Sequence, residues 1–499
     1  MSYLRRYISS ASMLAVQGVF QKILGIFSTI ILARNLNSRG FGLFNALIIT
    51  VNSGYGLVKL GLDGAIHVRM ADKDDSDKGN VLGAGLVLLS LSGLIAAPSV
   101  FVFSDQLASL IFKEPELTRW IKYAAVLIFV QCLTQFLYAT LVGLHRFAFY
   151  SVTMVIMSCA NLAALYIGIV LGGLQGAVLA VVFIKITTLV LFITYLKRYL
   201  QQKRLRFEYD RFRETAIQLL KLGFPFYMVG FVTIPVAYYM YGILSASAGV
   251  ENLGYMRIVV SINSIILFVP SSIAAATISF LSEANTDIAL AQEKFVVYSQ
   301  LNLKTTWYFC LSIGVILWIF VPTIIRIAFG KQYLVAVTAS RLGLFAAIFM
   351  VVMNVASNTY FAQKKVSLIF VQNAVYSVGF FAIGVLLVPR WGILGFVFSE
   401  LIGYFAVAVF VVLLFHLECR SLGMNPNFHW FLLVMTAAAA LVLSVVNVLG
   451  NELLEYVCGT GVLIAILISG YLLIFSPKER EAFSLYINQL FRKGRQILF

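Results

Sequence analysis

The sequence KRYLQQKRLRFEYDRFRETAIQLLK, residues 197–221, divides the chain in two and decides how the rest is interpreted. It contains eight cations in a chain with only 12% charged residues: Lys197, Arg198, Lys203, Arg204, Arg206, Arg211, Arg213 and Lys221. About two hundred residues of almost continuous apolar sequence lie on each side of it. A basic, polar segment between two long apolar halves is typical of a cytoplasmic linker between two membrane-embedded lobes.

The apolar halves are long enough to hold many membrane spans. Of the 499 residues, 61% are hydrophobic, and the mean hydropathy is +0.93. A spanning helix needs about 20 mostly apolar residues, so the composition predicts an all-α polytopic membrane protein. Fourteen spans are predicted, at residues 11–33, 41–62, 81–103, 119–142, 148–170, 174–196, 222–246, 254–282, 303–327, 339–361, 367–388, 393–415, 430–449 and 455–476.

Lys and Arg are unevenly distributed between the two sides. With Lys304 counted at the edge of its span, 24 of the 37 lie at the N-terminus, in every second loop, in the linker and in the C-terminal tail, whereas 7 lie in the opposite loops. Cytoplasmic loops carry the excess of Lys and Arg, so both termini and the linker are predicted in the cytoplasm. This topology explains the net charge of +16, and nucleic-acid binding is not expected.

Two short motifs recur in the two halves. Residues 31–44 match residues 243–256, with Gly42 on Gly254, and Gly173-Leu-Gln-Gly176 matches Gly392-Ile-Leu-Gly395. The alternative is chance similarity between Leu-rich and Gly-rich helices. Because each unit has six spans, an even number, the units share one orientation and are related by an axis along the membrane normal.

The repeat divides the chain into five parts. These are an N-lobe (1–196), the linker (197–221), a C-lobe (222–415), an extra helix pair (416–476) and a tail (477–499). In the tail, Phe483, Tyr486, Ile487, Leu490 and Phe491 recur at helical spacing among cations. This pattern predicts an amphipathic helix on the anionic inner leaflet, and a disordered tail is the alternative.

Ionisable side chains inside spans cost about 2.5–3.5 kcal/mol each and therefore need a partner or a wet cavity. The candidates are Lys22, Lys185, Arg257 and Glu400, with Lys59 and Asp63 nearer a span end. Polar neighbours extend three of these positions along helix faces: Gln17 and Gln21 beside Lys22, Asn45 and Asn52 with Lys59, and Ser261 and Ser264 with Arg257. These faces predict a hydrophilic cavity between the lobes, and helix packing or snorkelling is the alternative for each residue.

The charges inside the spans are mostly positive, which favours an anionic ligand. Lys185 and Glu400 lie on corresponding sixth spans, so they form either a structural ion pair or a gate, and the sequence leaves both open. No GxxxxGK[ST] phosphate loop is present, and His416 with Cys419 is a lone HxxC. No metal site, cofactor or enzymatic site is therefore predicted.

Further short motifs complete the pattern: Leu32-Ala-Arg-Asn-Leu36, Phe41-Gly42, Gly61-Leu62, Ile111-Phe-Lys-Glu-Pro-Glu116, Gly143-Leu-His-Arg146 and Phe329-Gly-Lys-Gln-Tyr333. With these motifs the chain resembles the Wzx-like polysaccharide flippases of the multidrug/oligosaccharidyl-lipid/polysaccharide (MOP) exporter superfamily. The resemblance covers essentially the whole chain. It implies a bacterial inner-membrane protein with two six-helix lobes around a cationic cavity, a MATE-like fold.

The resemblance also implies a function. The cargo would be a lipid-linked oligosaccharide moved by alternating access, with membrane lipids and the polysaccharide polymerase machinery as partners. Lys22 and Arg257 match positions where relatives place cavity cations, and Asp63, Glu283 or Glu400 would couple a proton or a sodium ion. The arginine-rich pattern of lipid II flippases is otherwise missing from spans 1 and 2, so that cargo is disfavoured. A multidrug antiporter of the same superfamily and a membrane glycosyltransferase or polymerase are the alternatives.

Overall fold

The computed structural model describes residues 2–71, 77–267, 288–363, 365–421, 427–449 and 452–469, and nearly all of them are helical. The longer helices are α1 (Ser2–Asn35), α2 (Ser38–Val58), α3 (Leu62–Met70), α4 (Lys78–Val102), α6 (Leu117–Gly143), α7 (Phe147–Lys203), α8 (Phe212–Ala248), α9 (Glu251–Ile266), α11 (Ile288–Ile324), α12 (Ala336–Ala362), α13 (Val366–Trp391), α14 (Ile393–Ser421), α15 (Asn427–Leu449) and α16 (Glu452–Ser469). Short segments are α5 (Ser104–Gln106), the π-helices η1 (Leu107–Ile111) and η2 (Ile325–Phe329), and the 3₁₀-helix η3 (Lys331–Tyr333).

The predicted spans correspond to these helices. Eleven helices in the described ranges are long and apolar enough to cross a membrane. One of them, α7, contains two predicted spans because Gly172 and Gly173 leave the helical conformation in its middle. The shorter helices α9 and α16 match the two remaining predicted spans. The predicted all-helical membrane fold is therefore confirmed.

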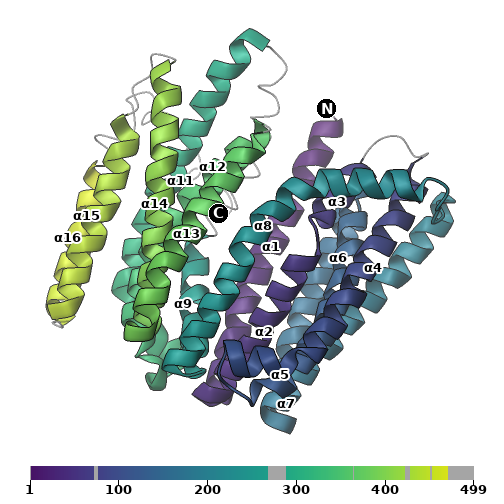
Figure 1. Ribbon diagram of the computed structural model, residues 1–499. Helices are drawn as coiled ribbons and strands as arrows, with labels where there is room; N and C mark the ends of the chain where they lie inside the picture. Colours follow the sequence, from purple (N-terminus) through teal and green to yellow (C-terminus); the bar gives the residue numbers. More distant parts are fainter. Residues whose placement is uncertain are drawn as a thin grey trace, which may run out of the picture.

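Two lobes and a helix pair make up the described structure (Figure 1). Helices α1–α7 form the N-lobe, and α9 and α11–α14 lie on the opposite side, with α15 and α16 at the outer edge. The first turns of α8 lie across the N-lobe, and the rest of α8 runs between the lobes toward the opposite end (Figure 1). Pro225 and Pro235 lie inside α8, and proline removes a helical hydrogen bond and permits bending.

The internal repeat is visible in the backbone. Gly173 has φ 55° and ψ −133°, and its predicted equivalent Gly392 has φ 54° and ψ −128°. Both lie in a region that favours glycine. A Cβ at Gly176 would overlap the Gly168 carbonyl, and one at Gly395 would overlap the Leu387 carbonyl. The π-helices η1 and η2 also lie at equivalent places in the two lobes, so the predicted parallel repeat holds in local conformation as well as in sequence.

The other predicted glycine pair forms a contact between the lobes. A Cβ at Gly42 of α2 would overlap the Val250 carbonyl at the start of α9, and a Cβ at Gly254 of α9 would lie 2.8 Å from the Phe41 ring. Repeat-equivalent residues that touch each other must lie near the axis that relates the repeats. We call this end of the bundle, which carries Arg39, the Arg39 end, and the opposite end the Lys59 end.

Polar contacts also join the lobes at the Arg39 end. The Arg39 guanidinium lies 2.7 Å from Glu114, 3.1 Å from Glu116 and 3.8 Å from Glu251 at the start of α9. Arg34 donates to the carbonyls of Ile327 and Ala328. These contacts connect α1 and α2 to the C-lobe, so the lobes are held together at this end.

The linker is shorter than the basic segment that predicts it. Helix α7 continues to Lys203 and ends at Arg204, which has φ 56°, and α8 begins at Phe212. Residues 197–221 contain no Gly or Pro, so the helices extend into the segment from both sides. The remaining turn is held against α4, because the Glu208 amide donates to the Gly79 carbonyl (3.0 Å).

The extra helix pair is attached to the C-lobe through a buried cation. Arg341 of α12 is 4% exposed and lies 2.6 Å from Glu455 of α16. It also donates to Asn447 of α15 at 2.5 Å, and its guanidinium lies 4.2 Å from the centre of the Trp318 ring of α11. One side chain thus connects four helices. The tail predicted as an amphipathic helix, residues 477–499, lies outside the described residues.

Replacing Gly61 by alanine is expected to lower the free energy of unfolding by about 2–4 kcal/mol. Gly61 has φ 69° at the start of α3, and a Cβ there would overlap the Gly223 carbonyl of α8. Thermal unfolding of the purified protein in nanodiscs measures the effect. Gly64→Ala in the same helix is the matched control, because nothing lies within 4 Å of a Cβ at that position. Equal unfolding temperatures for the two variants would contradict the packing argument.

Candidate functional site

Lys185 lies inside the bundle, on the second arm of α7. Its Nζ donates to Oε1 of Gln131 on α6 at 2.8 Å. No carboxylate lies within ion-pair distance of Lys185 among the described residues. The lysine is therefore held by a neutral amide, which fixes its position and leaves its charge uncompensated.

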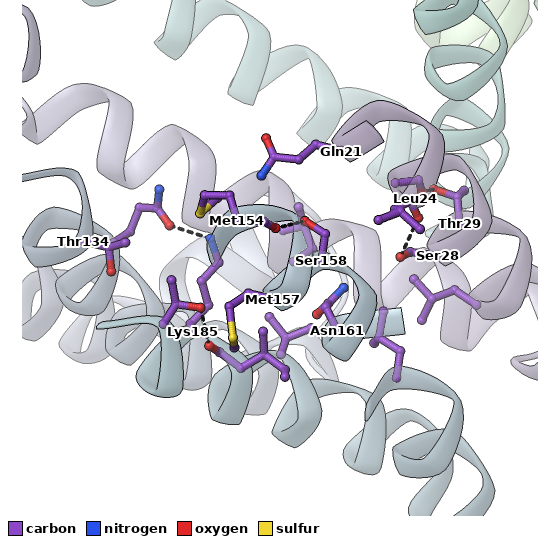
Figure 2. Close-up of a pocket in the computed structure, with 18 of the residues that line it drawn as sticks. Gln21, Leu24, Ser28, Thr29, Thr134, Met154, Met157, Ser158, Asn161 and Lys185 are labelled. Carbon is purple, nitrogen blue, oxygen red and sulfur yellow. Dashed lines mark hydrogen bonds between the residues drawn. The ribbon is translucent and has the colours of Figure 1, made fainter. Parts of the chain in front are cut away.

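Lys185 faces a cavity of about 370 Å³ inside the N-lobe (Figure 2). The walls come from α1, α2, α6 and both arms of α7, and Figure 2 shows Gln21, Asn161 and Lys185 around the space. Among the lining residues, Arg257 alone comes from the C-lobe, on α9, and none is acidic. A cation from each lobe thus faces the same cavity.

Arg257 also lines a second cavity, of about 250 Å³, which contains Asn45, Asn52 and Tyr241. Asn45 and Ile48 of α2 line both spaces. In the described part of the chain, the Arg257 guanidinium has no hydrogen-bond or ion-pair partner. An unpaired guanidinium at the junction of two cavities is suited to bind an anionic group through two parallel hydrogen bonds.

The first cavity brings together four of the predicted site residues: Gln21, Asn45, Lys185 and Arg257. Asn52 belongs to the second cavity. Gln17 is buried and donates to Gln21 at 2.5 Å. This bond orients the Gln21 amide, so Gln17 positions a cavity residue without lining the cavity itself.

Lys22 does not line either cavity. Its Nζ donates to the Leu267 carbonyl at 3.2 Å, at the C-terminal end of α9. A cation interacts favourably with the last carbonyls of a helix. Lys22 thus connects α1 to the C-lobe beside the cavity, and the sequence could not show which way it points.

Other predicted residues lie apart from the cavities. Ser261 donates to the Arg257 carbonyl at 2.8 Å and Ser264 to the Ser261 carbonyl at 2.7 Å, so both hydroxyls are bound to their own helix. Lys59 and Asp63 form an ion pair at 2.9 Å near the end of α2. Each of the four therefore already has an intramolecular partner.

Glu400 of α14 lines neither cavity. The ion pair with Lys185 that the sequence left open is not formed in this conformation, since no salt bridge or hydrogen bond joins the two among the described residues. Tyr241 of α8 lines the second cavity together with Arg257, and it lies within electrostatic range of both Arg257 and Glu400. Glu283 lies outside the described residues.

Three amide side chains of the cavity were not predicted from the sequence. Gln131 and Gln135 lie one turn apart on α6, and Asn161 lies on the first arm of α7. Their spacing places the two glutamines on one face of a span, which is a usable signal. The polar faces predicted from the sequence lie on spans 1, 2 and 8. Groups of three or more His, Cys, Asp or Glu side chains that could hold a metal ion are absent from the described residues.

Comparisons with known proteins agree with this architecture. A model of the family described as "Polysaccharide biosynthesis protein" matches residues 31–338. No match is found among curated protein sequences.

Several solved structures share the fold. "Lipid II flippase MurJ, inward closed conformation" aligns with a TM-score of 0.68 and 17% identity over 91% of this chain and 98% of that chain. An inward-facing multidrug resistance MATE family transporter of the MOP superfamily aligns with a TM-score of 0.67 and 18% identity over 81% and 95%. The structure described as "Reverse polarity of binding pocket suggests different function of a MOP superfamily transporter from Pyrococcus furiosus Vc1" aligns with a TM-score of 0.58 and 16% identity over 84% of this chain and 96% of that chain. These likenesses confirm the predicted MOP fold.

Proposed function

Because the chain belongs to the family of polysaccharide biosynthesis proteins, we propose that it is a flippase with a polyprenyl-pyrophosphate-linked oligosaccharide as cargo. It moves this cargo from the cytoplasmic to the outer leaflet of the bacterial inner membrane, with the Lys59 end on the cytoplasmic side. The protein works as a transporter and not as an enzyme.

The observation that carries this proposal is the charge of the first cavity. Lys185 from the N-lobe and Arg257 from the C-lobe face one space whose lining includes no carboxylate. A pyrophosphate offers several anionic oxygens, and both cations can form charge-assisted hydrogen bonds with them. A multidrug antiporter with cationic cargo would need the opposite sign in its cavity.

The polar groups of the cavity also lower the main barrier to moving a sugar chain. Burying a hydroxyl without a partner costs roughly 2–7 kcal/mol, so an oligosaccharide cannot cross the hydrocarbon core unaided. The cavity supplies amides and hydroxyls in place of water, while the polyprenyl tail stays in lipid. An inside-negative potential favours outward movement of each negative charge by about 2.3 kcal/mol per 100 mV.

The position of Arg257 connects ligand binding to lobe movement. A ligand that touches both Lys185 and Arg257 bridges the N-lobe and the C-lobe, so its binding depends on how the lobes are placed. The contacts of Arg34 and Arg39 hold the lobes together at the Arg39 end, and alternating access requires them to break. Glu400 is our candidate for proton or sodium coupling, because it lies on α14 of the C-lobe within electrostatic range of Tyr241 and has no ion-pair partner among the described residues.

A flipping assay in liposomes tests the function. The purified protein is reconstituted with a fluorescent polyprenyl-pyrophosphate-linked disaccharide, and the fraction exposed on each leaflet is followed with a membrane-impermeant quencher. We expect wild-type protein to speed exchange between leaflets and Lys185→Met to reduce its rate about tenfold or more, through loss of a charge-assisted hydrogen bond. Lys331→Met, an exposed lysine at the Arg39 end, is the matched control and is expected to behave as wild type. Wild-type protein that leaves the exchange rate at the protein-free level would overturn the proposed function.

A further inference from the structure

The hydrogen-bonding groups of the first cavity are not equally available to a ligand. Five hydroxyls donate to a carbonyl one turn earlier in their own helix, at 2.7–2.9 Å: those of Ser28, Thr29, Thr134, Ser158 and Thr188. Their donor capacity is used, and only their oxygen lone pairs face the space. The hydroxyls therefore contribute polarity more than specific recognition.

Three amides on α6 and α7 have free capacity in the same space. The side chains of Gln135 and Asn161 have no hydrogen-bond partner among the described residues, so each offers an unused carbonyl and an unused NH₂ group. Gln131 accepts from Lys185 through Oε1, which fixes the orientation of its amide. Its NH₂ group has no acceptor among the described residues and can donate to a ligand.

The chemistry of these amides fits a sugar ring. A side-chain amide presents one donor and one acceptor side by side, which matches two neighbouring hydroxyls of a pyranose. Gln131 and Gln135 come from α6 and Asn161 from α7, so the amides approach from two walls. One turn beyond Gln135, Tyr138 packs against Tyr150 with ring centres 4.8 Å apart, and both tyrosines line the cavity.

We propose that Gln131, Gln135 and Asn161 form a subsite for an uncharged sugar ring, separate from the contacts that Lys185 and Arg257 make with the pyrophosphate. This proposal rests on the proposed function. It identifies the part of the cargo that the N-lobe recognises. The volume of the first cavity, about 370 Å³, lies near the lower end of the range found for small-molecule pockets. The subsite therefore holds the sugar next to the pyrophosphate and not the whole oligosaccharide.

A binding comparison tests the subsite. The ligands are polyprenyl pyrophosphate alone and the same lipid carrying glucose, galactose or N-acetylglucosamine, titrated against full-length protein in nanodiscs. We expect wild-type protein to bind at least one sugar-bearing lipid about tenfold more tightly than the bare lipid. Gln135→Met and Asn161→Leu keep the side-chain volume, and each is expected to reduce that preference about threefold to tenfold while leaving the affinity for the bare lipid unchanged.

The outcomes separate this proposal from the function it rests on. Gln201→Met, which removes an exposed amide from α7 away from the cavity, controls for general effects of the substitution. Unchanged affinity of each variant for the bare lipid shows that it is folded. Wild-type protein that binds the bare lipid but prefers none of the three sugars would overturn the subsite alone, as would a preference that survives both substitutions. Wild-type protein that binds none of the four lipids would overturn the proposed function and the subsite with it.

Discussion

Flipping of the lipid-linked saccharide is expected to fall about a hundredfold when Arg257 is replaced by glutamine. The guanidinium is the C-lobe's contribution to the first cavity, and it faces the second cavity as well. Its loss removes two parallel charge-assisted hydrogen bonds to the pyrophosphate, each worth roughly 1.5–3 kcal/mol. It also removes the contact through which the cargo bridges the lobes.

The liposome assay measures the flipping rate, and titration with polyprenyl pyrophosphate measures the binding affinity. Arg257→Lys keeps the charge without the planar fork, so its rate is expected to lie between those of wild type and the glutamine variant. Arg390→Gln, an exposed arginine at the end of α13, is the matched control. A glutamine variant that is folded, binds polyprenyl pyrophosphate normally and flips at the wild-type rate would remove Arg257 from the mechanism.

The second large effect concerns stability. Replacing Arg341 by methionine is expected to lower the free energy of unfolding by about 3–5 kcal/mol, because the Glu455 carboxylate is left buried without its partner. The Glu455 side chain is only 14% exposed, so water does not fully replace the lost contact. Thermal unfolding in nanodiscs measures the loss, and increased protease sensitivity of α15 and α16 locates it.

A double variant distinguishes the ion pair from simple packing. Arg341→Met with Glu455→Leu removes both charges, and it is expected to recover most of the stability that the single variant loses. Arg213→Ala, an exposed cation of α8, is the control and is expected to change stability by less than about 0.5 kcal/mol. A double variant as unstable as Arg341→Met alone would show that the arginine acts through its volume.

Much of the fold was predictable because it depends on local properties of the sequence. Apolar runs predict helices that fit a membrane, and the glycines at 173 and 392 predict equivalent turns because few other residues adopt their conformation. The limits of the linker were less predictable. Its charge indicated the membrane boundary, whereas helix ends depend on caps and on packing against α4.

The site was predicted in part, for a physical reason. A charge inside a span shows the depth of a side chain but not the direction in which it points. The sequence alone could not show that Lys185 and Arg257 share a cavity, whereas Lys22 binds the end of α9. Gln131, Gln135 and Asn161 were missed because amides inside spans are common in helix packing, and only their unused hydrogen-bonding groups distinguish them. The buried ion pair of Arg341 could not be predicted because its partner, Glu455, is 114 residues away in the sequence.

The glycine contact between α2 and α9 has a mechanical consequence. Where two backbones meet without side chains between them, sliding is blocked by overlap, but tilting about the contact point is allowed. The meeting point of Gly42 and Gly254 lies at the Arg39 end of helices that cross about 30 Å of hydrocarbon. While this contact holds, the lobes pivot there and separate at the Lys59 end; opening the Arg39 end requires this contact to part together with those of Arg34 and Arg39. A tilt of about ten degrees over that length moves the far ends of the helices by about 5 Å, on the side where a bulky headgroup would have to enter.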